Sequence, residues 1–359
     1  LLVHNRNMKK LLVILIAFVF LFSPLLLSGL NKDEYEYTLT VEHLFTHCLI
    51  AYPNIAFAKD NPMRQNYNMD CITKDEFARI LNSLYENDYC LVDINDTFEN
   101  QNGVIVKKAV KVPKGKKALI LSFDDVNYDH KKMGLGMVDK IILDENGKFA
   151  TTTQIQDNED ISYSNEFIPM LENFVEKHPN FSPFNDMGTI NITGYDGILG
   201  YRTQSKNKVN RQEEIEKVKP IVKKLKQNGW NFASHSYGHY HMNKLTDEQF
   251  LEEVNLWKEE VEPLVGKTKV YVYPYGEWQV FDKYGNISNK HQYLLDAGFE
   301  LFCGVGMRTF YDYLPNKHNK VLFMDRKVVD GNTLRKKDAC LYPFFDPEFV
   351  YDYKSRPSV

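Results

Sequence analysis

Cysteine is scarce in this 359-residue chain, and none of its five cysteines forms a Cys-x-x-Cys pair. The sequence therefore contains no zinc-finger or zinc-ribbon pattern. In an exported chain the five could form up to two disulfides, but sparse and irregular spacing is also typical of small core residues, which is the interpretation favoured here. The five are Cys48, Cys71, Cys90, Cys303 and Cys340.

An excess of charge of one sign is also lacking, because 44 Lys and Arg stand against 48 Asp and Glu and give a formal net charge of -4. No overall attraction to nucleic acid or anionic lipid is expected, so a nucleic-acid partner is not predicted. With 43% hydrophobic and 26% charged residues and no internal repeat, the composition excludes disorder, collagen and coiled coil.

A long apolar run is present at the N-terminus, where Lys9 and Lys10 precede apolar residues that continue, with one Ser-Pro interruption, to Leu30. This is the pattern of a secretory signal, and about 20 apolar residues can also span a bilayer. We expect residues 1–30 to be a signal peptide or a membrane anchor, with Met8 as the natural start. The remainder is then secreted or membrane-anchored, faces outside the cytoplasm, and contacts the membrane only through this segment.

Helix and strand signals alternate along the remainder of the chain. Helices are predicted over 74–87, 166–178, 211–228, 246–261 and 290–297, and strands over 90–94, 118–123, 187–193, 230–235, 269–273 and 299–304. Pro220 should kink or split the third helix. Residues 138–155 indicate an inserted β-hairpin closed by an Asn-Gly turn. The alternation predicts an α/β fold with a parallel sheet and crossover helices.

Three of the predicted strands end on polar or turn-forming residues. These ends carry Asp124 and Asp125, then His235 to His239, then Pro274 and Tyr275. Active sites of parallel α/β sheets and barrels gather at the carboxyl ends of the strands, so these residues are expected to lie close together.

Metal-dependent hydrolysis is the chemistry that these residue types favour. Two imidazoles four residues apart, as on one side of a helical turn, can bind one ion, so His235 and His239 are candidate ligands. Asp125 would complete a two-His, one-carboxylate set with open positions, and Asp124 would then serve as general base toward a water. His241 more readily faces away, and His47 is either a core histidine or a residue of the pocket.

Together these segments resemble the polysaccharide deacetylases of carbohydrate esterase family 4, whose motifs are Thr-Phe-Asp-Asp, His-Ser-x-x-His and a third containing Pro-Tyr-Gly. The matching segments are Ser122-Phe123-Asp124-Asp125, His235-Ser236-Tyr237-Gly238-His239 and Tyr273-Pro274-Tyr275-Gly276. The resemblance implies a distorted (β/α) barrel of the NodB-homology type with an inserted β-hairpin. It further implies a deacetylase domain over 111–345, a lead-in over 31–110 packed on the barrel, and a tail over 346–359.

The resemblance also assigns roles to residues. Asp124 would be the base, and Asp125, His235 and His239 the metal ligands. The backbone N–H of Tyr275 would stabilise the tetrahedral oxyanion, and Pro274 and Tyr275 would contact the substrate. Zinc is the default ion, although cobalt, nickel or iron also suits two imidazoles and a carboxylate.

Three features depart from the family pattern. The chain between Asp125 and His235 is longer than is usual for the family, which is consistent with the inserted hairpin. The arginine that usually lies two residues before the proline of the third motif is replaced by Val272, and Arg326 is a candidate to orient the base in its place. The Leu-x-His that supplies the family's general acid has no clear counterpart, and His291 and His318 are weak candidates.

The sequence thus predicts an exported deacetylase that hydrolyses N-acetyl groups of GlcNAc- or MurNAc-containing envelope polymers, with an acetylated polysaccharide as its partner. Arg202 could contact a substrate carboxylate, or its Gly-rich segment could be a turn packed on the barrel rim. Two other functions stay open, a carbohydrate-binding protein without activity and a hydrolase of O-acetyl or other amide groups.

Overall fold

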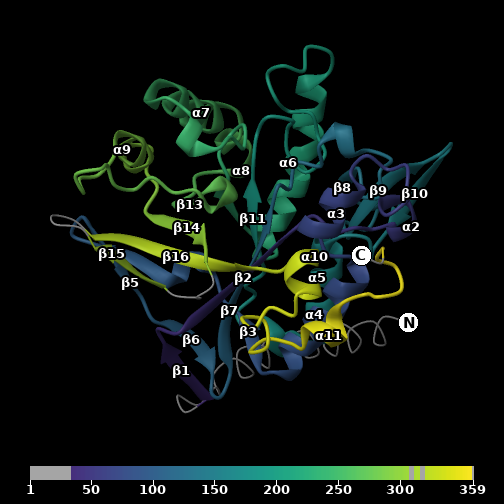
Figure 1. Ribbon diagram of the computed structural model, residues 1–359, viewed down its shortest axis with the longest axis horizontal. Helices are drawn as coiled ribbons and strands as arrows, with labels where there is room; N and C mark the ends of the chain where they lie inside the picture. Colours follow the sequence, from purple (N-terminus) through teal and green to yellow (C-terminus); the bar gives the residue numbers. More distant parts are fainter. Residues whose placement is uncertain (1–33, 307–310, 316–319, 358–359) are drawn as a thin grey trace, which may run out of the picture. The chain divides into compact units, whose positions relative to one another are not determined.

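Seven parallel strands close into a barrel in the computed structural model, which describes residues 34–306, 311–315 and 320–357 (Figure 1). Around the barrel the order is β11, β12, β13, β14, β16, β2 and β7, and β7 pairs again with β11. These strands are β2 (Val41–His47), β7 (Lys117–Asp124), β11 (Thr189–Ile192), β12 (Asn231–Ser234), β13 (Val270–Val272), β14 (Leu301–Val305) and β16 (Lys320–Val328). The predicted (β/α) barrel is therefore confirmed.

The chain divides into two units, Leu1–Glu36 and Tyr37–Val359, and the barrel belongs to the second. The signal or anchor predicted for residues 1–30 lies outside the described residues. Within the described part of the chain, no helix combines the length and apolar character needed to cross a membrane. The boundaries predicted at residues 110 and 345 stay predictions.

The barrel is distorted where β7 meets its neighbours. β3 (Tyr89–Leu91) pairs in parallel with the first residues of β7, and β11 pairs with its last residues along the same edge. β2, which the sequence analysis did not recognise as a strand, pairs with the whole length of β7 and so carries its own last residue, His47, to the carboxyl rim beside Asp124.

Side chains alternate between the inside and outside of the barrel along β7, as the twofold period of a strand requires. Ile120 and Asp124 point inward, whereas Phe123 points outward and stacks on Phe167 with ring centroids 3.8 Å apart. Arg326 reaches the same interior from β16 and is fully buried. This alternation brings Asp124 and Arg326 together at the top of the core.

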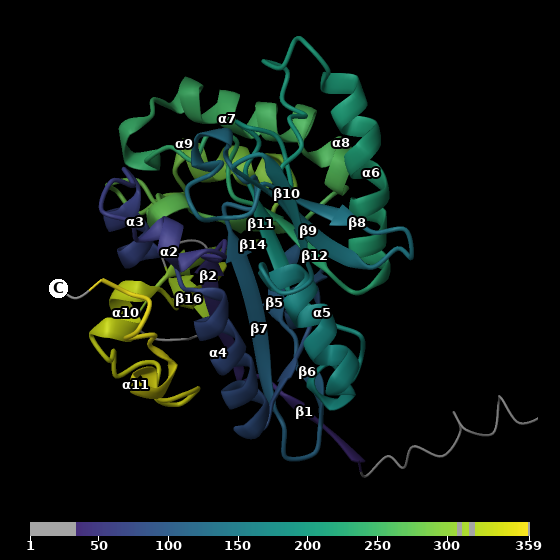
Figure 2. The same ribbon diagram turned by 90° about the vertical axis from the view of Figure 1, so that its right-hand side faces the viewer.

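Helices surround the barrel (Figures 1 and 2). They are α2 (Pro53–Ala56), α3 (Arg64–Asp70), α4 (Lys74–Glu86), α5 (Phe167–Lys177), α6 (Arg211–Gln227), α7 (Asp247–Glu260), α8 (Glu262–Val265), α9 (Asn289–Asp296), α10 (Gly331–Arg335) and α11 (Pro347–Val350). The capping boxes expected at Thr73 and Thr246 open α4 and α7. α6 is not split at Pro220, because a proline removes one backbone hydrogen bond while Val218, Ile221 and neighbouring side chains stay buried.

The predicted insertion is a sheet of three strands. β8 (Lys140–Leu143) and β9 (Phe149–Ile155) form the expected hairpin. β10 (Asn158–Ser162) adds a third strand, which was not predicted because its sequence is polar. Tyr52 donates a hydrogen bond of 2.5 Å to Asp160 and so fastens the sheet to the body. The remaining strands are β1 (Tyr35–Thr38), β4 (Phe98–Gln101), β5 (Val104–Lys107), β6 (Val110–Pro113) and β15 (Tyr311–Pro315).

Candidate functional site

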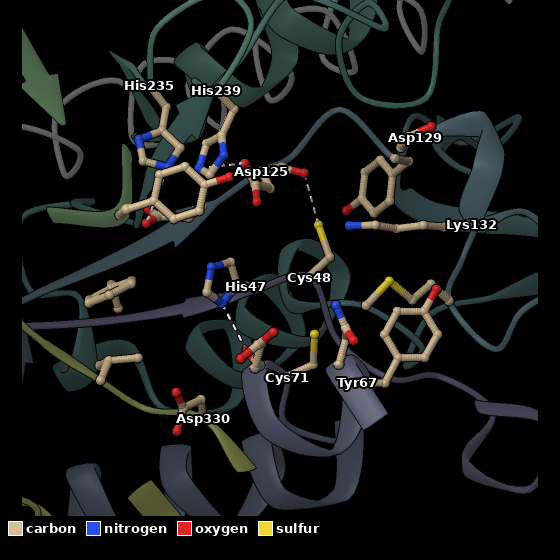
Figure 3. Close-up of a pocket in the computed structure, with 18 of the residues that line it drawn as sticks. His47, Cys48, Tyr67, Cys71, Asp125, Asp129, Lys132, His235, His239 and Asp330 are labelled. Carbon is tan, nitrogen blue, oxygen red and sulfur yellow. Dashed lines mark hydrogen bonds and ion pairs between the residues drawn. The ribbon is translucent and has the colours of Figure 1, made fainter. Parts of the chain in front are cut away.

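A cavity of about 690 Å³ lies at the carboxyl rim of the barrel (Figure 3). It brings together five residues singled out in the sequence, namely Asp124, Asp125, His235, His239 and Tyr275. Its wall also includes residues from the other strand ends and from α3, namely Phe45, His47, Cys48, Met63, Asn66, Tyr67, Asp70, Cys71, Tyr128, Asp129, Lys132, Met137, Val138, Tyr273, Gly276, Val305, Arg326, Val328 and Asp330.

Asp125, His235 and His239 form a candidate metal site. One ligand atom from each lies within 4.8 Å of the others, and the Asp125 Oδ1 atom is 3.6 Å from His239 Nε2. This buried Oδ1 has no hydrogen-bond partner among the described residues, as expected for an atom that is kept for a cation. The three residues fit a divalent ion of the two-His, one-carboxylate type.

The second nitrogen of His235 fixes its orientation. Its Nδ1 lies 2.9 Å from the carbonyl oxygen of Val272, which can only accept, so Nδ1 carries the proton and Nε2 keeps its lone pair for a ligand. Burial lowers the pKa of His235 to about 4. The imidazole is therefore neutral at physiological pH, which is the form that binds metal.

The two histidines meet through a loop, so the helical turn expected for their spacing is wrong. Residues after β12 form bends, with left-handed φ of +59° at Ser236 and +55° at His239. Ser236 Oγ accepts a hydrogen bond from the His239 N–H, and Glu253 of α7 accepts one from Gly238. These contacts place the imidazole rings with centroids 4.8 Å apart.

Replacing His239 by alanine is expected to weaken metal binding by at least about 100-fold, because one of three protein ligands is lost. The measurement is bound zinc per chain after dialysis at a defined free zinc concentration. His241→Ala is the matched control, since His241 lies outside this group of ligands. Equal zinc content in wild type and His239→Ala would exclude His239 as a ligand.

Asp124 is held by three hydrogen bonds. Arg326 donates from Nη1 to Oδ1 at 2.7 Å and from Nη2 to Oδ2 at 3.0 Å, and Asn191 donates to Oδ1 at 2.6 Å. Burial would raise the pKa of Asp124, but the charge of Arg326, and of His235 once it is protonated at low pH, lowers it more, so the net pKa lies well below the usual aspartate range. Asp124 is thus ionised and fixed in direction, and Arg326, the candidate named from the sequence, makes this contact.

Residues 202–294, which include the His235–His239 loop and Tyr275, match the family model described as polysaccharide deacetylase. The resemblance to the polysaccharide deacetylases is confirmed. A comparison with curated protein sequences finds no match.

Several solved structures of deacetylases are similar to this chain. The Streptococcus pyogenes deacetylase PplD, in complex with acetate, is 13% identical with a TM-score of 0.43, and the match covers 82% of this chain and 93% of PplD. IcaB from Ammonifex degensii is 13% identical with a TM-score of 0.41, covering 85% and 97%. A deacetylase-family pseudoenzyme from Bacillus anthracis is 12% identical with a TM-score of 0.27, covering 49% and 54%.

In this deacetylase-like site, Tyr275 adopts a left-handed backbone with φ +57° and ψ +8°. Asp125 and His239 are left-handed as well, and each non-glycine residue in this region costs about 1–2 kcal/mol. The Tyr275 ring stacks on His241 with centroids 3.9 Å apart and planes 9° apart, and His241 Nδ1 lies 2.9 Å from Glu277 Oε1. This stacking supports the strained turn that carries the Tyr275 N–H.

The Tyr275 N–H is available to a ligand, because no acceptor takes it among the described residues. The Tyr275 side chain is half exposed at the cavity rim, so the residue offers both a backbone donor and an aromatic face. Pro274 is buried and does not line the cavity. Its contact with substrate stays a prediction.

His47 supplies a further imidazole to the deacetylase-like cavity. Figure 3 shows it across Asp125 from His235 and His239. Its Nδ1 lies 2.9 Å from the Asp70 carbonyl oxygen, which leaves Nε2 free of that contact. His291 is buried against Tyr273 and does not line the cavity, so the structure gives it no part in the site. His318 lies outside the described residues.

Arg202 lies away from the cavity, in a shallower hollow beside His130. Its guanidinium donates to the Asp196 carboxylate at 2.9 Å and to the Tyr128 carbonyl oxygen at 2.7 Å. These bonds fasten the loop that follows β7 to the Gly-rich turn, in agreement with the structural interpretation of that segment. A contact with substrate stays a prediction.

Proposed function

We propose that this chain is a metal-dependent polysaccharide deacetylase that hydrolyses N-acetyl groups of GlcNAc- or MurNAc-containing envelope polymers outside the cytoplasm. The proposal rests on one observation, which is that two sets of residues line the same cavity. Asp125, His235 and His239 form the ligand set, and next to them Asp124 is fixed through both oxygens by Arg326. This combination suits the activation of a water against an amide carbonyl.

Asp125, His235 and His239 would hold the ion, which supplies a Lewis acid that lowers the pKa of a water toward about 7. Asp124 takes the proton from the attacking water as the bond to the acetyl carbon forms. Its lowered pKa keeps it in the basic form at every physiological pH, and Arg326 prevents it from rotating away.

The Tyr275 N–H donates to the oxygen that becomes negative when the acetyl carbon turns tetrahedral. A backbone donor held in place before the reaction stabilises this charge without reorganisation. His241, through its stacking on the Tyr275 ring, keeps the donor in place.

His47 is placed to protonate the leaving amine. Its Nδ1–H is engaged with the Asp70 carbonyl oxygen, so a proton on Nε2 is the one that can be transferred. Breakage of the C–N bond then releases acetate and a free amino group on the sugar. His47 therefore replaces the missing Leu-x-His in function, from the end of β2.

Replacing His47 by glutamine is expected to lower kcat about 10²- to 10⁴-fold while zinc content stays the same, because a general acid is lost and no ligand is removed. The measurement is steady-state acetate release from N-acetylated chito-oligomers. His130→Gln, on a histidine outside the cavity, is the control and should keep wild-type activity. Full activity of His47→Gln would remove His47 from the mechanism.

The bond that is cleaved tests the proposal against a hydrolase of O-acetyl groups. The zinc-loaded protein is offered N-acetylated chito-oligomers and, separately, O-acetylated xylan. We expect new primary amines on the chito-oligomers and acetate from that substrate alone. Acetate from the xylan without amine formation on the chito-oligomers would show an esterase, and no acetate from either would favour a binding protein.

A further inference from the structure

The catalytic cavity continues past the candidate metal site into a recess between α3 and the loop that follows β7 (Figure 3). Lys132 and Tyr67 enter this recess from opposite walls, with Cys48 and Cys71 at its base. We call this group the Lys132 recess. The mechanism proposed above uses none of these four residues.

Lys132 is a cation without a partner in this recess. Its ammonium group forms no hydrogen bond or ion pair within the described residues, although the side chain is half-buried. Asp129, an acid of the same loop, accepts from the Lys131 N–H at 2.9 Å and from the Tyr195 hydroxyl at 3.4 Å, and it forms no ion pair with Lys132 among the described residues. An ammonium group that lacks a direct hydrogen-bond or ion-pair partner can still donate to a ligand.

Tyr67 is a second unpartnered donor in the wall of this recess. The residue is only 1% exposed, and its hydroxyl has no hydrogen-bond partner in the described part of the chain. Buried hydroxyls in proteins are almost always paired, so a free one beside a cavity indicates a group that arrives with a ligand. Two converging donors, one of them charged, suit an anion such as a carboxylate.

The recess lies directly beside the reacting centre. Cys48 Sγ is 3.5 Å from the Asp125 backbone oxygen, and Lys132 and Asp125 line the same cavity. The metal ion would neutralise the charge of Asp125. The substrate would then supply the anion that pairs with Lys132. An anion bound here must therefore sit close to the acetamido group that is hydrolysed.

We propose that Lys132 and Tyr67 form a subsite for a carboxylate carried on the carbon next to the acetamido carbon, so that the preferred substrate unit is an N-acetylmuramic-type sugar. Such a sugar bears its acetamido group on C2 and a lactyl carboxylate on the neighbouring C3. The inference rests on the proposed function. Among the GlcNAc- or MurNAc-containing polymers named there, the subsite would select the units that carry the lactyl carboxylate.

Other acids of the cavity do not cancel the subsite. Asp124 is paired with Arg326, and Asp70 lies exposed at the mouth, where water screens its charge. Asp330 uses its Oδ1 to cap α10.

The test compares two substrates of equal length, a chito-oligomer and a peptidoglycan-derived glycan that contains N-acetylmuramic acid, with the zinc-loaded full chain. In Lys132→Met we expect kcat/KM to fall about 10- to 100-fold on the muramic glycan and less than about twofold on the chito-oligomer, since a charged hydrogen bond is lost from one substrate only. Tyr67→Phe should give a smaller loss with the same selectivity. Lys131→Met is the matched control, because Lys131 is exposed and outside the cavity.

Equal losses on both substrates, or no loss on either, would overturn the subsite. If wild type releases acetate from neither substrate, the proposed function fails but the subsite is still decided by equilibrium binding. N-acetylmuramic acid should then bind wild type at least about tenfold more tightly than N-acetylglucosamine, and Lys132→Met should abolish the difference. Equal binding of the two sugars to wild type would contradict the proposal.

Discussion

Replacing Asp124 by asparagine is expected to lower kcat about 10²- to 10⁴-fold while the protein keeps its metal ion. The amide cannot accept the proton of the attacking water, but the ligand set of Asp125, His235 and His239 is untouched. Zinc content and acetate release from chito-oligomers, measured on one preparation, check both halves of the prediction.

Asp125→Asn is a useful comparison with Asp124→Asn, because this variant should lose both its metal ion and its activity. Asn191→Leu gives a second comparison, since it removes one 2.6 Å hydrogen bond to Asp124 but leaves the carboxylate and Arg326 in place. Its loss of kcat should be smaller than that of Asp124→Asn. Normal turnover by Asp124→Asn would remove Asp124 from the role of base.

Replacing Arg326 by methionine is expected to destabilise the fold by about 3–5 kcal/mol. Removal of one partner of a buried ion pair leaves the other charge unpaired, and both side chains are at most 3% exposed. Urea unfolding of the metal-free protein at neutral pH measures the free energy of unfolding of wild type and variant. The double variant Arg326→Met with Asp124→Asn should recover part of the loss, because no buried charge is left. Equal stability of wild type and Arg326→Met would contradict the account of this pair.

The pH dependence of stability should change sign in the same variant. In wild type the pKa of Asp124 is lowered in the folded state, so its contribution is present above the usual aspartate pKa and is lost as the pH falls through the folded value. Without Arg326, burial raises that pKa above its unfolded value. Arg326→Met should therefore gain stability as the pH falls through the raised folded pKa toward the usual aspartate pKa, a range in which the Asp124 contribution to wild type stays constant.

Local sequence signals predicted most of the barrel. The capping boxes at Thr73 and Thr246 are local patterns, and α4 and α7 begin there as predicted. The apolar run that ends at Asp124 is also a local pattern, and it forms β7. β2, β10 and β16 were among the strands that were not predicted, because their sequences mix polar and apolar residues without a clean period. β2 is recognised only through its pairing with β7, which no local pattern encodes.

The candidate site was predictable where residues are close in sequence or lie at strand ends. Asp125, His235 and His239 were found by residue type and spacing, although a loop and not a helical turn joins the histidines. His47 was left open because its strand was not recognised. Arg326 could be named only as a candidate, since its contact with Asp124 spans 202 residues and depends on barrel closure.

Acetate release after chelation and metal return tests the central claim most directly. The chain from near Asn31 onward is stripped with a chelator and offered N-acetylated chito-oligomers and peptidoglycan with and without added zinc. The account predicts release only with zinc, and none from Asp124→Asn under the same conditions. No release by zinc-loaded wild type on any glycan would contradict it, and the residues at this rim would then serve binding without hydrolysis.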